Sequence, residues 1–112
     1  MSDSPDRPIT WFRVGDADML KEGRITTVQA GHYAICLTRT KKGYGAISNR
    51  CAHQGGPLGD GFLQDGCVVC TWHGYEYDPH TGATPPDYDD PPVESFPVEL
   101  RDDGLYVGVR EP

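Results

Sequence analysis

Residues 51–73 read C-A-H-Q-G-G-P-L-G-D-G-F-L-Q-D-G-C-V-V-C-T-W-H. A Cys-x-His motif opens this stretch, a Cys-x-x-His motif closes it, and sixteen residues lie between them. Short spacers place one thiol and one imidazole on each of two turns, and the intervening segment is long enough to return the second turn to the first. Cys51, His53, Cys70 and His73 are therefore candidate ligands of one small metal centre, with the rest of the chain as scaffold.

The segment between the two motifs carries the signal for a returning hairpin. Residues 62–64 and 67–69 are predicted strands on either side of Asp65-Gly66, a dipeptide typical of two-residue β-turns. Residues 49–60 are rich in Gly and Pro, as expected of a backbone that wraps closely around a compact centre. The hairpin is therefore predicted to bring the second motif back beside the first.

The remaining sequence predicts an all-β chain that forms one domain. Fourteen Gly and ten Pro in 112 residues favour short strands joined by tight turns over helices. The one predicted helical turn runs from Asp16, a candidate N-cap, to Leu20. Apolar alternation and β-branched residues predict a meander of three strands, a short strand after the second motif and a closing hairpin, and the predicted strands cover residues 9–14, 25–30, 33–40, 44–48, 75–78, 96–101 and 105–109.

Three segments are predicted to lie outside the strands. Residues 1–8 are polar, carry two prolines and are expected to form a flexible tail. Residues 80–82 are a predicted turn. Residues 85–92 read P-P-D-Y-D-D-P-P, and because proline lacks the backbone donor of a sheet ladder, this segment is predicted to be a stiff acidic loop.

Two histidines and two cysteines lie outside the motifs. His32 falls at a predicted turn with no partner at metal-site spacing, so we expect a solvated imidazole. His80 also falls in a turn and is expected to be a decoy and not a ligand. Cys36 lies in the middle of a predicted strand, where a small buried thiol is expected. Cys67 is predicted to fill a strand position, although its spacing from Cys70 could suggest a Cys-x-x-Cys pair.

Charge and cysteine content restrict the compartment and the partners. The net charge is −7 and the pI is near 4.8, which disfavours nucleic acid and anionic membranes as partners and favours a basic protein surface. Residues 1–6 show neither a signal peptide nor a membrane span, so a cytoplasmic protein is expected. Four cysteines in a reducing compartment favour metal ligation, with disulfides as the minor alternative.

The order of the ligands separates two candidate metals. Structural zinc accepts two Cys and two His, but common zinc modules place the two Cys on one turn and the two His on another. Here each motif supplies one of each. This order suits a two-iron centre in which one iron takes both thiolates and the other both imidazoles. A zinc-binding interaction module is the remote alternative.

At these motifs the sequence resembles the Rieske family. The second motif continues as C-T-W-H-G-Y-E-Y-D-P-H-T-G and is similar to the corresponding run of bacterial Rieske ferredoxins and of the Rieske domains of ring-hydroxylating oxygenases. The resemblance extends from W-F-R-V-G through Y-G-A-I-S-N-R-C-A-H to V-E-L-R-D-D-G-L-Y-V, roughly residues 10–109. It implies an antiparallel β-sandwich that carries a small cluster-binding subdomain at about residues 49–92, with the proline loop as a cover.

The resemblance also implies the cofactor and its ligands. Cys51 and Cys70 would bind one iron and His53 and His73 the other iron of a single [2Fe–2S] cluster per chain. Rieske proteins of respiratory cytochrome complexes are similar but carry two further cysteines, which form a disulfide, and a serine beside the cluster. The corresponding residues here are Gly56, Trp72 and Tyr75. Losing the serine donor predicts a low reduction potential, about −150 mV within the Rieske range.

The predicted function is one-electron transfer. The sequence shows no His/carboxylate triad for mononuclear iron and no dinucleotide or flavin signature, so the chain is predicted to be a carrier and not itself an enzyme. The resemblance implies a monomeric ferredoxin that passes electrons from a ferredoxin reductase to a terminal oxygenase. The alternative is a small subunit or module of a larger oxidoreductase, similar to the small subunit of nitrite reductase.

Acidic residues are predicted to surround the cluster. They lie in or near the loops that would enclose it and could steer the carrier toward basic docking patches. A solvated acidic surface without a docking role is an equally open interpretation. The set comprises Asp60, Asp65, Asp87, Asp89, Asp90 and Glu94.

Overall fold

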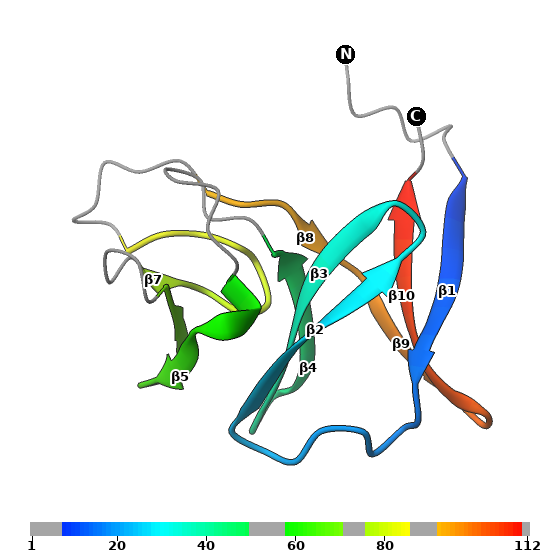
Figure 1. Ribbon diagram of the computed structural model, residues 1–112, viewed down its shortest axis with the longest axis horizontal. Helices are drawn as coiled ribbons and strands as arrows, with labels where there is room; N and C mark the ends of the chain where they lie inside the picture. The colour runs from blue at the N-terminus through cyan, green and yellow to red at the C-terminus, as the bar shows by residue number, and fades with distance from the viewer. Residues whose placement is uncertain (1–7, 50–57, 71–75, 86–91, 111–112) are drawn as a thin grey trace.

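The computed structural model describes residues 8–49, 58–70, 76–85 and 92–110 (Figure 1). Ten strands and one 3-10 turn, η1, make up the regular structure of these residues. In chain order the elements are β1 (Ile9–Gly15), β2 (Arg24–Ala30), β3 (Tyr33–Thr40), β4 (Gly43–Ser48), η1 (Leu58–Asp60), β5 (Phe62–Gln64), β6 (Cys67–Val69), β7 (Glu76–Tyr77), β8 (Ser95–Phe96), β9 (Val98–Arg101) and β10 (Gly104–Arg110).

The strands form three antiparallel sheets. The orders are β1-β10-β9, β2-β3-β4-β8 and β5-β6-β7. Figure 1 shows the β2-β3-β4-β8 sheet in the middle, with the first sheet on one side and the β5-β6-β7 sheet on the other. The predicted all-β sandwich is confirmed, as are the meander of β2, β3 and β4 and the closing hairpin of β9 and β10. No helix among the described residues is long and apolar enough to cross a membrane.

The first two sheets enclose one buried cluster, the inter-sheet core. Its strand residues alternate along the sequence, so that every second side chain of β3 and β10 points into it. Partly buried residues such as Phe12 and Val98 pack around it. The core consists of Ala30, Ile35, Leu37, Ala46, Phe96, Leu105, Val107 and Val109.

A second buried cluster, the loop-side core, covers the opposite face of the β2-β3-β4-β8 sheet. Cys36 and Ile47 enter it from the sheet, because their side chains alternate with those that face the inter-sheet core. The predicted burial of Cys36 in the middle of a strand is confirmed. The remaining members come from the third sheet, η1 and the segment before β8, and the whole set is Cys36, Ile47, Leu58, Val68, Cys70, Tyr77 and Val93.

The chain passes from one sheet to the other at Pro97. β8 ends at Phe96 and pairs with β4, whereas β9 begins at Val98, after Pro97, and pairs with β10. The sequence predicts one strand over residues 96–101, and this prediction is wrong. Proline has no backbone N–H, so Pro97 cannot donate to a continuous ladder, although its carbonyl accepts a hydrogen bond from Gly108 N at 2.9 Å. On edge strand β9, Leu100 is 59% exposed.

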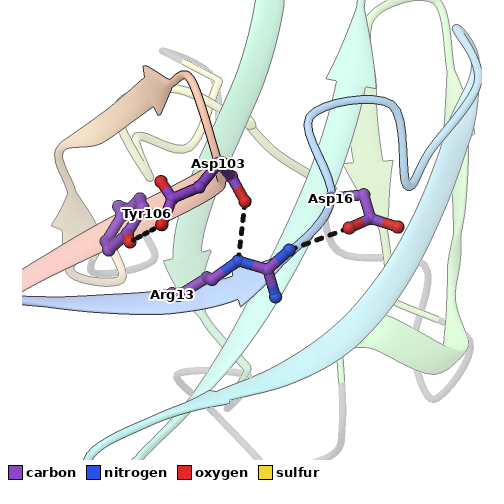
Figure 2. A network of polar contacts seen from close by, with 4 residues as sticks. All are labelled: Arg13, Asp16, Asp103 and Tyr106. Atoms are coloured by element: carbon purple, nitrogen blue, oxygen red, sulfur yellow. Dashed lines mark hydrogen bonds and ion pairs between the residues drawn. The ribbon is translucent and has the colours of Figure 1, made fainter.

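The helical turn predicted over residues 16–20 is also wrong. The segment forms a single turn in which Met19 N donates to Asp16 O at 3.1 Å. One such hydrogen bond does not extend into a helix, because nucleation fixes several residues for a single bond. Figure 2 shows that the Asp16 carboxylate accepts a hydrogen bond from Arg13 Nη2 at 2.8 Å. Arg13 Nε also donates to the carbonyl of Asp103 at 2.8 Å, so one guanidinium joins the end of β1 to the β9–β10 turn. The structure instead contains the unpredicted 3-10 turn η1.

Candidate metal centre

Cys70 is the one proposed ligand that lies within the described residues. It directly follows β6, is fully buried and belongs to the loop-side core. Cys51, His53 and His73 fall in residues 50–57 and 71–75, outside the described part of the chain. The structure therefore describes the residues on either side of the two loops that carry the proposed ligands, residues 50–57 and 71–75.

The ends of the first loop are held together by main-chain contacts. Leu58 N donates to Asn49 O at 2.9 Å, and Asn49 N donates to Ala34 O at 3.0 Å. These bonds close residues 50–57 at their base and attach that base to β3. Leu58 itself is fully buried in the loop-side core, the cluster that also contains Cys70.

The chain leaving the first loop runs against the chain entering the second. A Cβ added to Gly61 would collide with the carbonyl oxygen of Val69, so the two backbones approach too closely for any larger residue. Phe62 pairs with Val69 in the predicted β5–β6 hairpin. Asp65 and Gly66 both have positive φ, 53° and 81°, as the predicted tight turn requires. The hairpin therefore returns the chain to Gly61, whereas the predicted approach of Cys70 to Cys51 involves residues outside the described part of the chain.

The ends of the second loop are neighbouring strands. β6 precedes residues 71–75, β7 follows them, and Val68 pairs with Tyr77 across the sheet. Beyond β7 the Asp78 carboxylate accepts hydrogen bonds from His80 N at 2.8 Å and Thr81 N at 3.0 Å. Burial opposes the charge of this carboxylate, but these bonds and the nearby His80 and Lys42 leave the pKa of Asp78 lowered.

The described end of the proline loop is hydrogen-bonded to two segments, the turn after β7 and the end of β4. Val93 N donates to Gly82 O at 3.0 Å, and Ser48 N donates to Glu94 O at 2.8 Å. The chain after residue 91 thus bridges the turn beyond β7 and the end of β4, where the first loop begins. The cover predicted for residues 85–92 lies largely outside the described residues.

The remaining cysteines and histidines have separate environments. His32 is exposed at the β2–β3 turn, as predicted. The Nε2 atom of His80 lies 3.1 Å from Thr40 Oγ1 within a hydrogen bond. Burial raises the pKa of the Cys36 thiol to about 12. The pKa of Cys67 is raised by partial burial and then by Glu76, Asp78 and Asp65.

Neither a disulfide nor a second metal site is formed by the described residues. Cys36, Cys67 and Cys70 are not joined to one another. Among the described side chains no three of the types His, Cys, Asp and Glu come together as a metal site. Sequence reasoning missed the contacts of Asn49, the residue that closes the first loop, and its place two residues before the Cys-x-His motif was the available signal.

Comparison with known proteins places the chain among iron–sulfur proteins. The profile described as "Rieske [2Fe-2S] domain" matches residues 10–97. The chain is 29% identical over 99 residues to the anthranilate 1,2-dioxygenase ferredoxin subunit of Burkholderia cepacia, covering 88% of this chain and 92% of that protein. It is 30% identical over 92 residues, 79% of this chain, to human apoptosis-inducing factor 3, but spans only 14% of that relative's length.

Solved structures agree with the fold. The ferredoxin of carbazole 1,9a-dioxygenase from Nocardioides aromaticivorans IC177 aligns with a TM-score of 0.80 and 25% identity over 91% of this chain and 99% of that one. A chain in the complex of reduced oxygenase and oxidized ferredoxin in carbazole 1,9a-dioxygenase aligns with a TM-score of 0.77 and 25% identity. The alignment covers 86% of this chain and 99% of that one. A putative NADH-dependent nitrite reductase small subunit from Mycobacterium tuberculosis shares the fold with a TM-score of 0.81 and 18% identity. The alignment covers 94% of this chain and 99% of that one. With its profile match over residues 10–97, the chain belongs to the Rieske [2Fe-2S] domain family.

Proposed function

We propose that the chain is a one-electron carrier of an oxygenase system, with one [2Fe–2S] cluster per chain. Cys51 and Cys70 would bind one iron, and His53 and His73 the other. The single observation that carries this proposal is the match to a dioxygenase ferredoxin subunit over 92% of that protein's length. That relative is itself a ferredoxin subunit, which supports the proposal of a carrier.

The donor set and the frame fit such a cluster. Two thiols and two imidazoles are the ligands that Rieske centres use. The described frame supports the use of both loops at one centre, because η1 runs directly from the first loop into the core that contains Cys70. The same convergence supports the proposal that residues 49–92 form a cluster-binding subdomain.

The ligand types determine what the centre does when it is bound. Two thiolates neutralise the oxidised core, whereas four would leave it negative, so the added electron is easier to accept and the cluster supplies reversible one-electron chemistry. Cys70 is fully buried in the loop-side core, which supports a sulfur held away from bulk solvent. The second ring nitrogen of each histidine ligand remains available to hold a proton.

The charge distribution fits a basic protein partner. Residues 51–96 contain eight Asp or Glu and no Lys or Arg, whereas the rest of the chain has nine acidic and ten basic residues. The net charge of −7 therefore resides in the segment that contains the ligands. Asp60, Asp65 and Glu94 are exposed. We infer that this segment steers the carrier to basic surfaces of a terminal oxygenase and of a ferredoxin reductase.

Electron transfer to a basic acceptor tests the carrier function. Dithionite-reduced protein is mixed in a stopped-flow instrument with cytochrome c, a basic one-electron acceptor, at increasing salt. The proposal predicts complete oxidation of the carrier and a rate that falls as salt screens the acidic segment. A cluster-containing protein that does not reduce cytochrome c would contradict the carrier function, and a salt-independent rate would contradict the steering.

A second candidate is a subunit held within a larger oxidoreductase. The fold shared with the putative nitrite reductase small subunit favours it. Gel filtration of the protein from its native cytoplasmic extract separates the two: a carrier elutes as a monomer near 12.3 kDa, whereas a subunit elutes with its partner. Elution in a stable large complex would favour the subunit.

A further inference from the structure

Asn49 occupies a particular place at the start of the first ligand loop. It is the only asparagine of the chain, follows β4 directly and precedes Cys51 by two residues. Its main chain bonds to Ala34 on one side and to Leu58 on the other. The two ends of the loop, residues 49 and 58, are thereby joined.

The side chain of Asn49 adds a second set of contacts. Its Oδ1 accepts a hydrogen bond from Gly59 N at 2.5 Å and another from Thr27 Oγ1 at 3.3 Å. Thr27 belongs to β2 and Gly59 to η1. The side-chain oxygen of Asn49 therefore connects the residue after β4 to strand β2 and to η1, the segment that leaves the loop.

Gly59 makes this arrangement possible. A Cβ at this position would collide with Thr27 Oγ1 and come too close to Asn49 Oδ1. The residue before Gly59 in η1, Leu58, is fully buried in the loop-side core that also contains Cys70. The position of the loop exit is thus determined by polar contacts on one side and by apolar packing on the other.

We propose that Asn49 is a positioning residue for the first ligand loop. Its carboxamide fixes the separation and direction of the loop ends. The loss of conformational entropy on closing the loop therefore does not weaken metal binding by Cys51 and His53. This inference rests on the proposed function, because it takes Cys51 and His53 as cluster ligands. Asn49 is not itself one of the proposed ligands.

The contacts of Asn49 show which substitutions distinguish a role in positioning the loop from a general effect on stability. Both side-chain contacts use Oδ1 as an acceptor, so Asn49→Asp keeps them and Asn49→Leu removes them. The matched control is Gln29→Leu, which replaces the side-chain amide of a residue on β2, the strand that also carries Thr27. Gln29 Nε2 donates to Gly31 O at 3.2 Å at the β2–β3 turn. Thr27→Val removes one contact and serves if Asn49→Leu does not fold.

The experiment follows the cluster in purified holoprotein. Visible absorbance with an iron chelator gives the rate of cluster loss, EPR gives the g-values, and circular dichroism gives the unfolding midpoint. Asn49→Leu is expected to lose its cluster about tenfold faster than wild type and to show shifted g-values. Asn49→Asp and Gln29→Leu are expected to retain the wild-type rate, and Thr27→Val an intermediate one.

The outcomes are distinguishable. An Asn49→Leu protein with wild-type cluster loss and g-values overturns the positioning role, as does one in which only the unfolding midpoint changes. Equal effects of Asn49→Leu and Gln29→Leu also overturn it. A wild-type protein that binds no iron contradicts the proposed function instead, whatever the variants do.

Discussion

The two buried cores on opposite faces of the β2-β3-β4-β8 sheet differ in how they are built. The inter-sheet core consists of side chains that alternate along regular strands, and all of them are apolar. The loop-side core draws on η1, the short β6 and β7 and the segment before β8, and it includes two cysteines and a tyrosine. We infer from the comparison that one face of a single sheet maintains the fold, while the other face holds Cys70, the one proposed ligand among the described residues.

Replacing the two cysteines of the loop-side core should produce the largest difference. Cys70→Ala is expected to abolish the visible and EPR signals of the cluster, because it removes a proposed iron ligand. Cys36→Ala is the matched control, since Cys36 is also fully buried in this core. It should lose only packing and keep the signals. Complete loss of the cluster in Cys36→Ala, or its retention in Cys70→Ala, would contradict the proposed ligand assignment.

Two fully buried leucines test whether the cores act separately. Leu37 belongs to the inter-sheet core and Leu58 to the loop-side core. Each change to alanine is expected to cost about 2–5 kcal/mol of the free energy of unfolding, because each leaves a cavity. Denaturant titration should show that Leu37→Ala loses the cluster only on global unfolding. Leu58→Ala should lose it before the sheets unfold. Identical behaviour of the two variants would refute a division between the cores.

The Cys36 thiol predicts a smaller effect at alkaline pH. Burial raises its pKa from 9.0 to about 12, so between these values the folded protein holds a proton that the unfolded chain releases. This contribution to stability is complete below pH 9 and decreases as pH rises, by about 1.4 kcal/mol per pH unit. Unfolding measured at pH 9 and pH 10.5 should therefore show a steeper decline in wild type than in Cys36→Ala. Parallel declines would exclude Cys36 as the cause.

The regular elements could be predicted because their signals are local. β3, β5 and β6 have the predicted bounds, since alternation and the Asp65-Gly66 turn specify them without long-range information. The division at Pro97 could not be placed from alternation alone. Phe96 and Val98 keep the same spacing whether the chain stays in one sheet or passes to another, and only the pairing with β4 or β10 distinguishes the two.

The candidate site was predictable in part for the same reason. The ligand pattern is a sequence motif, so it is visible without a fold, and its assignment stays a prediction because only Cys70 is described. The contacts of Asn49 depend on Thr27 and Gly59, which come from distant or irregular segments. The helical turn predicted from Asp16 did not form because its segment closes only one turn, and a candidate N-cap does not by itself offset the cost of helix nucleation.

The most direct test is metal analysis combined with spectroscopy of aerobically purified protein. Iron and zinc are determined on the sample whose visible and low-temperature EPR spectra are recorded before and after dithionite. We predict a red-brown protein with about two irons per chain and a reduced-state signal with an average g below about 2, as expected of a histidine-ligated [2Fe–2S] cluster. A colourless, EPR-silent protein without iron after reconstitution, or one with zinc in its place, would contradict the proposed electron carrier.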